Sequence, residues 1–245
     1  MTAASSESPA PLQHPGIPEE PTDDDALIEK LRTRAWDPGR RVDRARVPRA
    51  WIAERYGASW FDRPHPGLRA TGSDGSVTLE SWAEEVATYY AEAPRGPLFP
   101  PVTMAEVEDV ERQIGRRLPD VLRRIWTEVA DGGFGPDGGL VSVREGNRVP
   151  GHLSDWPSAV KVQERARAEG VPASWFYLTG GGCTMYWYIS LLAVDNPVLL
   201  YDCDGWEPGW GETPHDGLRH ATTSLRKWLW TWAEGGDVWR EVLDR

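Results

Sequence analysis

The residues best suited to metal binding or nucleophilic chemistry lie in the last third of the chain. Cys183 and Cys203 are its two cysteines, and His215 and His220 follow them. A zinc site usually draws two ligands from within a few residues, and no Cys-x-x-Cys pair occurs here. A Cys–His nucleophilic pair would also need a third group to orient the histidine, and the sequence indicates none. We therefore predict no metal, no cofactor and no catalytic residue, with both cysteines acting as small apolar residues.

A triple glycine, Gly180-Gly181-Gly182, follows a predicted strand, as a phosphate-binding loop would. It lacks the Lys-Ser/Thr pair of that motif, and the next residues, Thr184–Ile189, are typical of a strand rather than a helix. We expect a tight turn or a bulge between two strands.

The segment 191–216 contains six carboxylates and no lysine or arginine, with aromatic residues interleaved. Aromatic rings provide contact area and carboxylates steer and pair with arginine, so this pattern favours a basic protein partner. The predicted partner-binding residues are Asp195, Tyr201, Asp202, Asp204, Trp206, Glu207, Trp210 and Glu212. The alternative interpretation is that this segment is a solvent-exposed acidic edge that binds no partner, and that Trp206 and Trp210 lie in the core. A calcium site is disfavoured because the twelve-residue ligand loop is absent.

Composition narrows the classes of function. The 245-residue chain has a formal net charge of −11, which disfavours binding to nucleic acid or an anionic membrane. It lacks a run of about 18 apolar residues and the basic-then-apolar layout of a secretory signal. Two cysteines are too few for a disulfide framework. We expect a cytoplasmic protein with reduced thiols, and most of its 14 tryptophans in the core.

The N-terminal part is divided by composition. Residues 1–22 are rich in Pro, Ser, Ala and Glu and are predicted to be a disordered tail. Residues 23–95 are predicted to be mostly helical, with a short amphipathic helix after Asp23 and helical spacing over Leu79–Tyr90. The basic patch at 40–46 is interpreted as a solvated helix face rather than a nucleic-acid contact. The role of this region is not indicated by the sequence.

A helical hairpin follows a proline-rich linker. Thr103 and Glu106 form a predicted capping box, and Gly115 can end that helix. Pro119 is placed to open the second helix, which ends at Asp131-Gly132-Gly133. The expected buried faces are Met104, Val107, Val110 and Ile114 on the first helix and Leu122, Ile125, Trp126 and Val129 on the second.

Short apolar runs bounded by turn residues then predict strands at Leu140–Val143, Trp175–Leu178, Thr184–Ile189 and Val198–Tyr201. A helix is expected from about Ser158 to Glu169. Leu225, Trp228, Leu229 and Trp232 share one face of a closing helix that ends before Gly235-Gly236. The predicted class is α+β with a mainly antiparallel sheet.

The stretch 107–120, VEDVERQIGRRLPD, resembles the opening of SUKH (Smi/Knr-type) domains, found in fungal cell-wall-synthesis regulators and bacterial immunity proteins. The family-motif positions are Ile114, Gly115, Leu118, Pro119, Trp126, Gly132 and Gly133. Asp131 stands where the family typically has Asn, and Leu122 where it often has an aromatic residue. The resemblance covers about residues 98–235, leaving 236–245 as an extension. It implies a sheet of about six strands packed by the hairpin and the closing helix.

For bacterial members, the resemblance implies neutralisation of a toxin domain by direct binding. We therefore expect a non-catalytic protein-binding domain whose partner is a protein, with a basic toxin domain as the leading candidate. Two alternatives stay open. One is a regulatory scaffold in cell-wall or stress signalling, and the other is a small-ligand binder or enzyme with a Trp-rich pocket.

Overall fold

The computed structural model describes residues 23–36, 46–62, 68–71, 76–79, 98–147 and 156–240. The predictions of a disordered tail at 1–22, of the basic patch over 40–45 and of a helix beyond Leu79 lie outside these residues.

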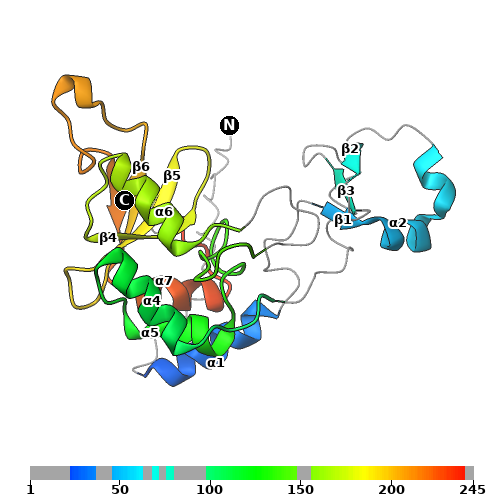
Figure 1. Ribbon diagram of the computed structural model, residues 1–245, viewed down its shortest axis with the longest axis horizontal. Helices are drawn as coiled ribbons and strands as arrows, with labels where there is room; N and C mark the ends of the chain where they lie inside the picture. The colour runs from blue at the N-terminus through cyan, green and yellow to red at the C-terminus, as the bar shows by residue number, and fades with distance from the viewer. Residues whose placement is uncertain are drawn as a thin grey trace, which may run out of the picture.

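A four-stranded antiparallel sheet organises the larger body (Figure 1), in the order β4 (Trp175–Gly180), β5 (Met185–Ser190), β6 (Val198–Asp202) and β7 (Leu218–Ala221). This confirms the α+β class and three of the predicted strands. Within the described residues this sheet has four strands rather than the expected six or so, and β7 was not predicted.

Residues 140–143 do not form the predicted strand. Ser142 makes a single bridge with Ser158, and Val141 donates one hydrogen bond to Leu178 O at 2.9 Å. The reason is a residue outside this run, because the buried Asp131 carboxylate accepts the N–H groups of Val143 at 2.6 Å and Arg144 at 3.1 Å. Those N–H groups are therefore not used in a strand ladder.

The helical hairpin is present as predicted. It consists of α4 (Met104–Ile114) and α5 (Asp120–Arg124), which continues into a π-helical turn, η3 (Ile125–Val129). Both halves of the capping box form, and Gly115 ends α4 at a φ of 75°, which suits glycine. Pro119 is the N-cap of α5 rather than its first residue.

The predicted faces of the hairpin are buried, with one exception. Met104 is 40% exposed because it opens α4, and Val102, just before the helix, lies in the core instead. After the hairpin, Gly132 has a φ of 79°, and a Cβ atom there would lie 2.5 Å from Leu140 O. Glycine is therefore required at position 132.

The main core lies between one face of the sheet and the helices α4, α5 with η3, and α7 (Leu225–Ala233). Trp126, Trp187 and Trp228 are among its largest fully buried side chains. On the other face, α6 (Ala159–Ala168) packs near a second cluster that includes Trp175, Tyr188 and Tyr201. Most tryptophans of the described residues are buried or half-buried, as predicted.

Helix α1 (Asp24–Ala35) belongs to the same core although it precedes the predicted domain. Its buried residues Leu27, Ile28, Leu31 and Ala35 join the main cluster, and the helix contacts α7 and η3 (Figure 1). Val238, beyond α7, is also part of that cluster. The folded body therefore extends past both ends of residues 98–235.

Residues 46–79 include three short strands that were not predicted, beside the helices of this region. Strands β1 (Arg46–Pro48), β2 (Leu68–Thr71) and β3 (Ser76–Leu79) pair antiparallel in the order β1-β3-β2. Helix α2 (Arg49–Tyr56) and the turn η2 (Ala58–Asp62) accompany them. The alternation and β-branched residues of Ser76-Val77-Thr78-Leu79 favour a strand over a helix.

Candidate functional site

The loop between β6 and β7, residues 203–217, carries most of the predicted partner-binding residues. In Figure 1 this orange segment, with the short 3₁₀ turn η4 (Pro208–Trp210), projects beyond the end of the sheet. The geometry of this loop divides those residues into anchors and an exposed tip.

Aromatic contacts hold the base of the loop against the sheet. Trp206 donates its indole N–H to the Tyr201 hydroxyl at 2.5 Å, and Tyr201 is 3% exposed within β6. On the returning side, the His215 ring meets Trp175 edge-on with ring centroids 5.1 Å apart. Tyr201 and Trp206 therefore hold the base of the loop against the sheet.

Polar contacts reinforce both ends of the loop. Arg219 on β7 pairs with Asp202 at 3.3 Å and reaches Gly205 O at 3.5 Å. The Asp216 carboxylate accepts the Thr213 N–H at 2.8 Å, and this bond lowers the pKa of Asp216. Asp202 is thus used within the fold, and its charge is compensated by Arg219.

The tip, residues 207–212, is preformed by its own hydrogen bonds. Glu207 donates its N–H to the Glu212 carboxylate at 2.7 Å, and Trp210 donates its N–H to Glu207 O at 3.0 Å. Gly211 follows with a φ of 81°, a conformation that glycine adopts without strain. The Trp210 side chain is left 79% exposed, so the alternative in which both tryptophans are in the core is wrong for Trp210.

The loop that carries Trp210, residues 203–217, contains four carboxylates and no lysine or arginine. Asp204, Glu207 and Glu212 are exposed, and none takes part in an ion pair within the described part of the chain. Binding to this tip therefore does not require an existing ion pair to be broken. A cationic partner would find an exposed ring beside uncompensated carboxylates.

Asp195 does not belong to this group. It lies in the β5–β6 turn, before β6, whereas the loop follows the other end of that strand. Its carbonyl accepts the N–H of Leu225 at the start of α7. Of the eight predicted residues, Asp204, Glu207, Trp210 and Glu212 form the exposed surface, and Tyr201, Asp202 and Trp206 anchor it.

The sequence analysis did not identify two residues that anchor the loop, Arg219 and His215. Arg219 is the first basic residue after the acidic segment, which was a usable signal, because an acidic run commonly pairs with the nearest cation. The contact of His215 with Trp175 joins residues far apart in the chain, and no local pattern indicates it.

The cysteines and histidines do not assemble a metal centre in the described residues, where no group of three His, Cys, Asp or Glu side chains could hold a metal ion. Cys183 is exposed in the β4–β5 turn. Burial, followed by the neighbouring Asp204, raises the pKa of the Cys203 thiol, which disfavours the thiolate. Gly181 donates its N–H to Met185 O at 2.8 Å, forming the tight turn expected for the triple glycine.

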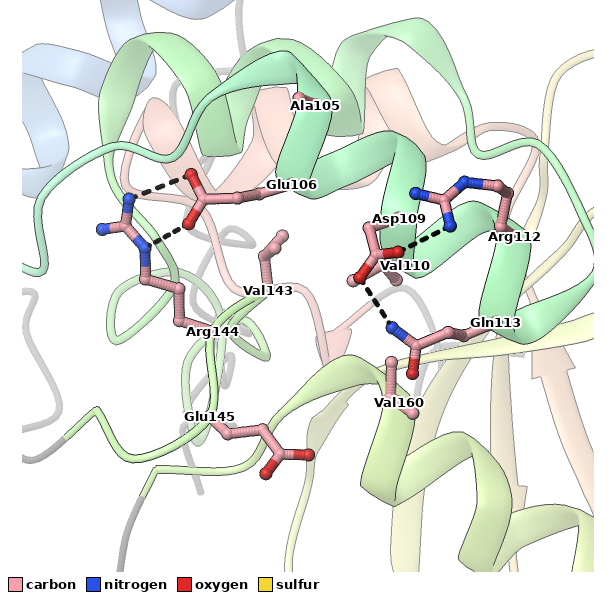
Figure 2. A pocket seen from close by; sticks show the side chains of 10 residues that line it. All are labelled: Ala105, Glu106, Asp109, Val110, Arg112, Gln113, Val143, Arg144, Glu145 and Val160. Atoms are coloured by element: carbon pink, nitrogen blue, oxygen red, sulfur yellow. Dashed lines mark hydrogen bonds and ion pairs between the residues drawn. The ribbon is translucent and has the colours of Figure 1, made fainter.

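A groove of about 520 Å³ lies between α4 and the first turn of α6, with Val110, Val143 and Val160 in its lining. Figure 2 shows that Glu106 and Arg144 point toward each other, as do Asp109 and Arg112. Glu106 binds Arg144 at 2.7 Å, and Asp109 binds Arg112 at 2.7 Å. The polar groups of this groove are therefore already paired rather than converging on an open volume.

Among the described residues, no helix is both long and apolar enough to span a bilayer. No protein-family model matches the chain, and a search of curated proteins finds no match to its sequence.

Proposed function

We propose that this chain is a non-catalytic protein-binding domain that presents the tip of the β6–β7 loop to a basic protein partner. The observation that carries the proposal is the 79% exposure of Trp210 on a loop anchored at both ends. An exposed indole on a preorganised loop can lose its hydration on binding without a large ordering cost. Tryptophan is among the side chains most often found to dominate interface energies.

Charge supports the same partner class. The chain carries a formal net charge of −11, and Asp204, Glu207 and Glu212 surround the tip. Such a field accelerates encounter with a cationic surface and opposes approach to phosphate backbones. Complementarity of this kind acts mainly on the association rate and is weakened by salt.

The resemblance to SUKH domains supports a narrower proposal, that the partner is a toxin domain and the chain an immunity protein. Toxins that act on nucleic acids tend to be basic because their substrate is anionic. The acidic tip is suited to a surface of that kind. The capped hairpin, the antiparallel sheet and the closing helix are compatible with such a domain.

The two other functions receive less support. A regulatory scaffold needs no single dominant partner. The exposed ring and the carboxylates lie together on one loop, which favours a single dominant partner instead. A ligand binder or enzyme would use convergent polar groups, whereas the charged side chains of the α4–α6 groove pair with each other.

The experiment is a comparative capture from native lysate with the tagged full-length chain, read by mass spectrometry. We expect one dominant protein with a basic domain, retained by the wild type and lost by Trp210→Ala. The matched control is Glu54→Lys with Asp62→Lys, which changes two exposed carboxylates away from the loop and should retain the partner. The captured domain should then be toxic when expressed alone and harmless when co-expressed with this chain. A partner retained equally by Trp210→Ala would refute a role of the tip.

A further inference from the structure

The segment after α7, residues 236–240, turns back onto the body of the protein. Gly236 donates its N–H to Thr231 O at 2.8 Å, and Arg240 donates to Asp237 O at 3.3 Å. Val238 is 6% exposed, and Trp239 is half-buried against the main core. Two apolar side chains thus pack this short segment, here called the strap, on the domain.

Trp239 occupies a slot made by residues distant in the sequence. One carboxylate, Asp137, accepts two indole N–H groups: Oδ1 accepts from Trp239 at 2.5 Å, and Oδ2 accepts from Trp187. The two indole rings meet edge-on with centroids 5.2 Å apart. Trp187 is fully buried and forms the floor of the slot.

Gly181 forms a wall of the slot. A Cβ atom at Gly181 would lie 2.8 Å from Cζ2 of Trp239 and 3.1 Å from the indole nitrogen of Trp187. The absence of a side chain at this position is therefore what lets the ring enter.

Both the backbone conformation of Asp137 and the burial of its carboxylate are energetically unfavourable. Its φ of 49° lies in the left-handed region, which non-glycine residues seldom adopt. Burial raises the pKa of its carboxyl, and the nearby Asp237 acts in the same direction. A desolvated carboxylate needs a donor on each oxygen, and a ring without an N–H group would leave Oδ1 unsatisfied.

We propose that Asp137, Gly181 and Trp187 form an indole-binding slot, filled in cis by Trp239 on a releasable strap and able to accept an indole in trans when the strap is withdrawn. The ligand class is an aromatic bicycle with a free ring N–H. This inference is independent of the tip around Trp210 and of the proposed partner.

The test begins with hydrogen exchange on the unmodified full-length chain. We expect the amides of 236–240 to exchange through an opening that needs less free energy than global unfolding. The Trp239→Ala variant should still unfold cooperatively, and amides near Gly181 and Trp187 should exchange faster. Trp239→Phe, which keeps a ring but lacks the N–H, should behave more like the alanine variant than like the wild type.

Calorimetry then probes the vacated slot with indole and with 1-methylindole. Trp239→Ala should bind indole about tenfold more tightly than 1-methylindole, the effect of one hydrogen bond to a charged acceptor. Adding Gly181→Val to that variant fills the slot and should abolish binding, and the wild type should bind neither compound. Strap amides that exchange only on global unfolding, or a Trp239→Ala chain that binds both compounds equally or neither, would overturn the proposal.

Discussion

At the scale of single residues, Asp131 is the one acidic side chain that is buried among the described residues. It is fully buried, and its oxygens accept hydrogen bonds from Val143 N–H, Arg144 N–H and, at 2.7 Å, the Asn147 side-chain amide. These bonds favour the ionised form, but burial dominates and raises the pKa of Asp131 to about 6. Asp131 thus organises the loop at 142–147 and makes the stability of that loop depend on pH.

The sign of that dependence follows from linkage. Because the folded pKa is raised, the folded state holds the proton more tightly, and the contribution of Asp131 to stability falls as pH rises from about 4 to about 6. The full change is about 3 kcal/mol. Urea unfolding of the wild type and of Asp131→Asn between pH 4 and 8 measures it, as the difference between their unfolding free energies. As pH rises, we expect the free energy of unfolding of the wild type to fall relative to that of Asp131→Asn. A difference between the two that does not change with pH would contradict this linkage.

Trp126 provides a second prediction at this scale. Its ring is fully buried, its indole N–H donates to Val141 O at 3.0 Å, and it packs edge-on against Phe176. Trp126→Ala should lower the free energy of unfolding by about 3–5 kcal/mol. Trp126→Phe keeps most of the ring and should cost less, about 1–3 kcal/mol, for the carbonyl left unpaired. A loss below about 1 kcal/mol for the alanine variant would place this ring outside the core.

At the scale of elements, the turn between α4 and α5 is held by side-chain contacts and by a glycine. The Glu111 side chain accepts the Leu118 N–H at 2.8 Å and lies 3.3 Å from Arg123. Leu118 is 2% exposed, and Gly115 allows the chain to reverse after α4. Capping, periodicity and glycine placement are local signals, and they predicted both helices of the hairpin correctly.

Elements that depend on distant partners were predicted less well. Strand β7 has four residues, and it is defined by pairing with β6 across the long acidic loop. The apolar run at 140–143 has the composition of a strand, but Asp131, outside that run, takes its N–H groups. A sequence window around either segment contains none of the information that decides its structure.

The capping box of α4 allows a prediction for this element. Thr103 Oγ1 accepts the Glu106 N–H, and the Glu106 carboxylate accepts the Thr103 N–H and binds Arg144, which lowers the pKa of Glu106 to about 2. Thr103→Ala should cost about 1 kcal/mol, and Thr103→Ser, which keeps the hydroxyl, much less. Thermal unfolding at pH 7 compares the two. Equal melting temperatures for both variants would show that the box does not stabilise the helix.

At the scale of the whole molecule, the domain is built from segments that are not contiguous. Helix α1 contributes Leu27, Ile28 and Leu31 to the main core, and Lys30 pairs with Glu234 of the α7 C-cap at 2.8 Å. The sequence predicted the amphipathic helix, but its partners follow more than sixty residues later, and nothing in its own pattern identifies them. The sequence predicted which residues of the acidic loop belong together. Only the structure shows which of them anchor the loop and which are exposed at its surface.

Loss of α1 should therefore destabilise the entire body. A chain that begins at residue 98 would expose the surface that α1 covers, and we expect it to lose cooperative unfolding. Within the full chain, Leu31→Ala should cost about 2–5 kcal/mol, whereas Glu29→Ala on the exposed side should cost less than about 0.5 kcal/mol. Urea titrations of these variants measure the difference, and a shortened chain with an unchanged midpoint would show that α1 is dispensable.

The most direct test of the central claim is the association rate of the captured partner, measured by stopped-flow fluorescence over a range of salt concentrations. Asp204→Lys with Glu207→Lys reverses two exposed charges of the loop and leaves unchanged Asp202, which pairs with Arg219, and Glu212, whose carboxylate accepts the Glu207 N–H. We predict association at least about tenfold slower than the wild type at low salt, with the difference shrinking as salt rises, and an unchanged rate for Glu54→Lys with Asp62→Lys. Equal rates for the wild type and the tip variant at every salt concentration would contradict binding of a basic partner through this loop.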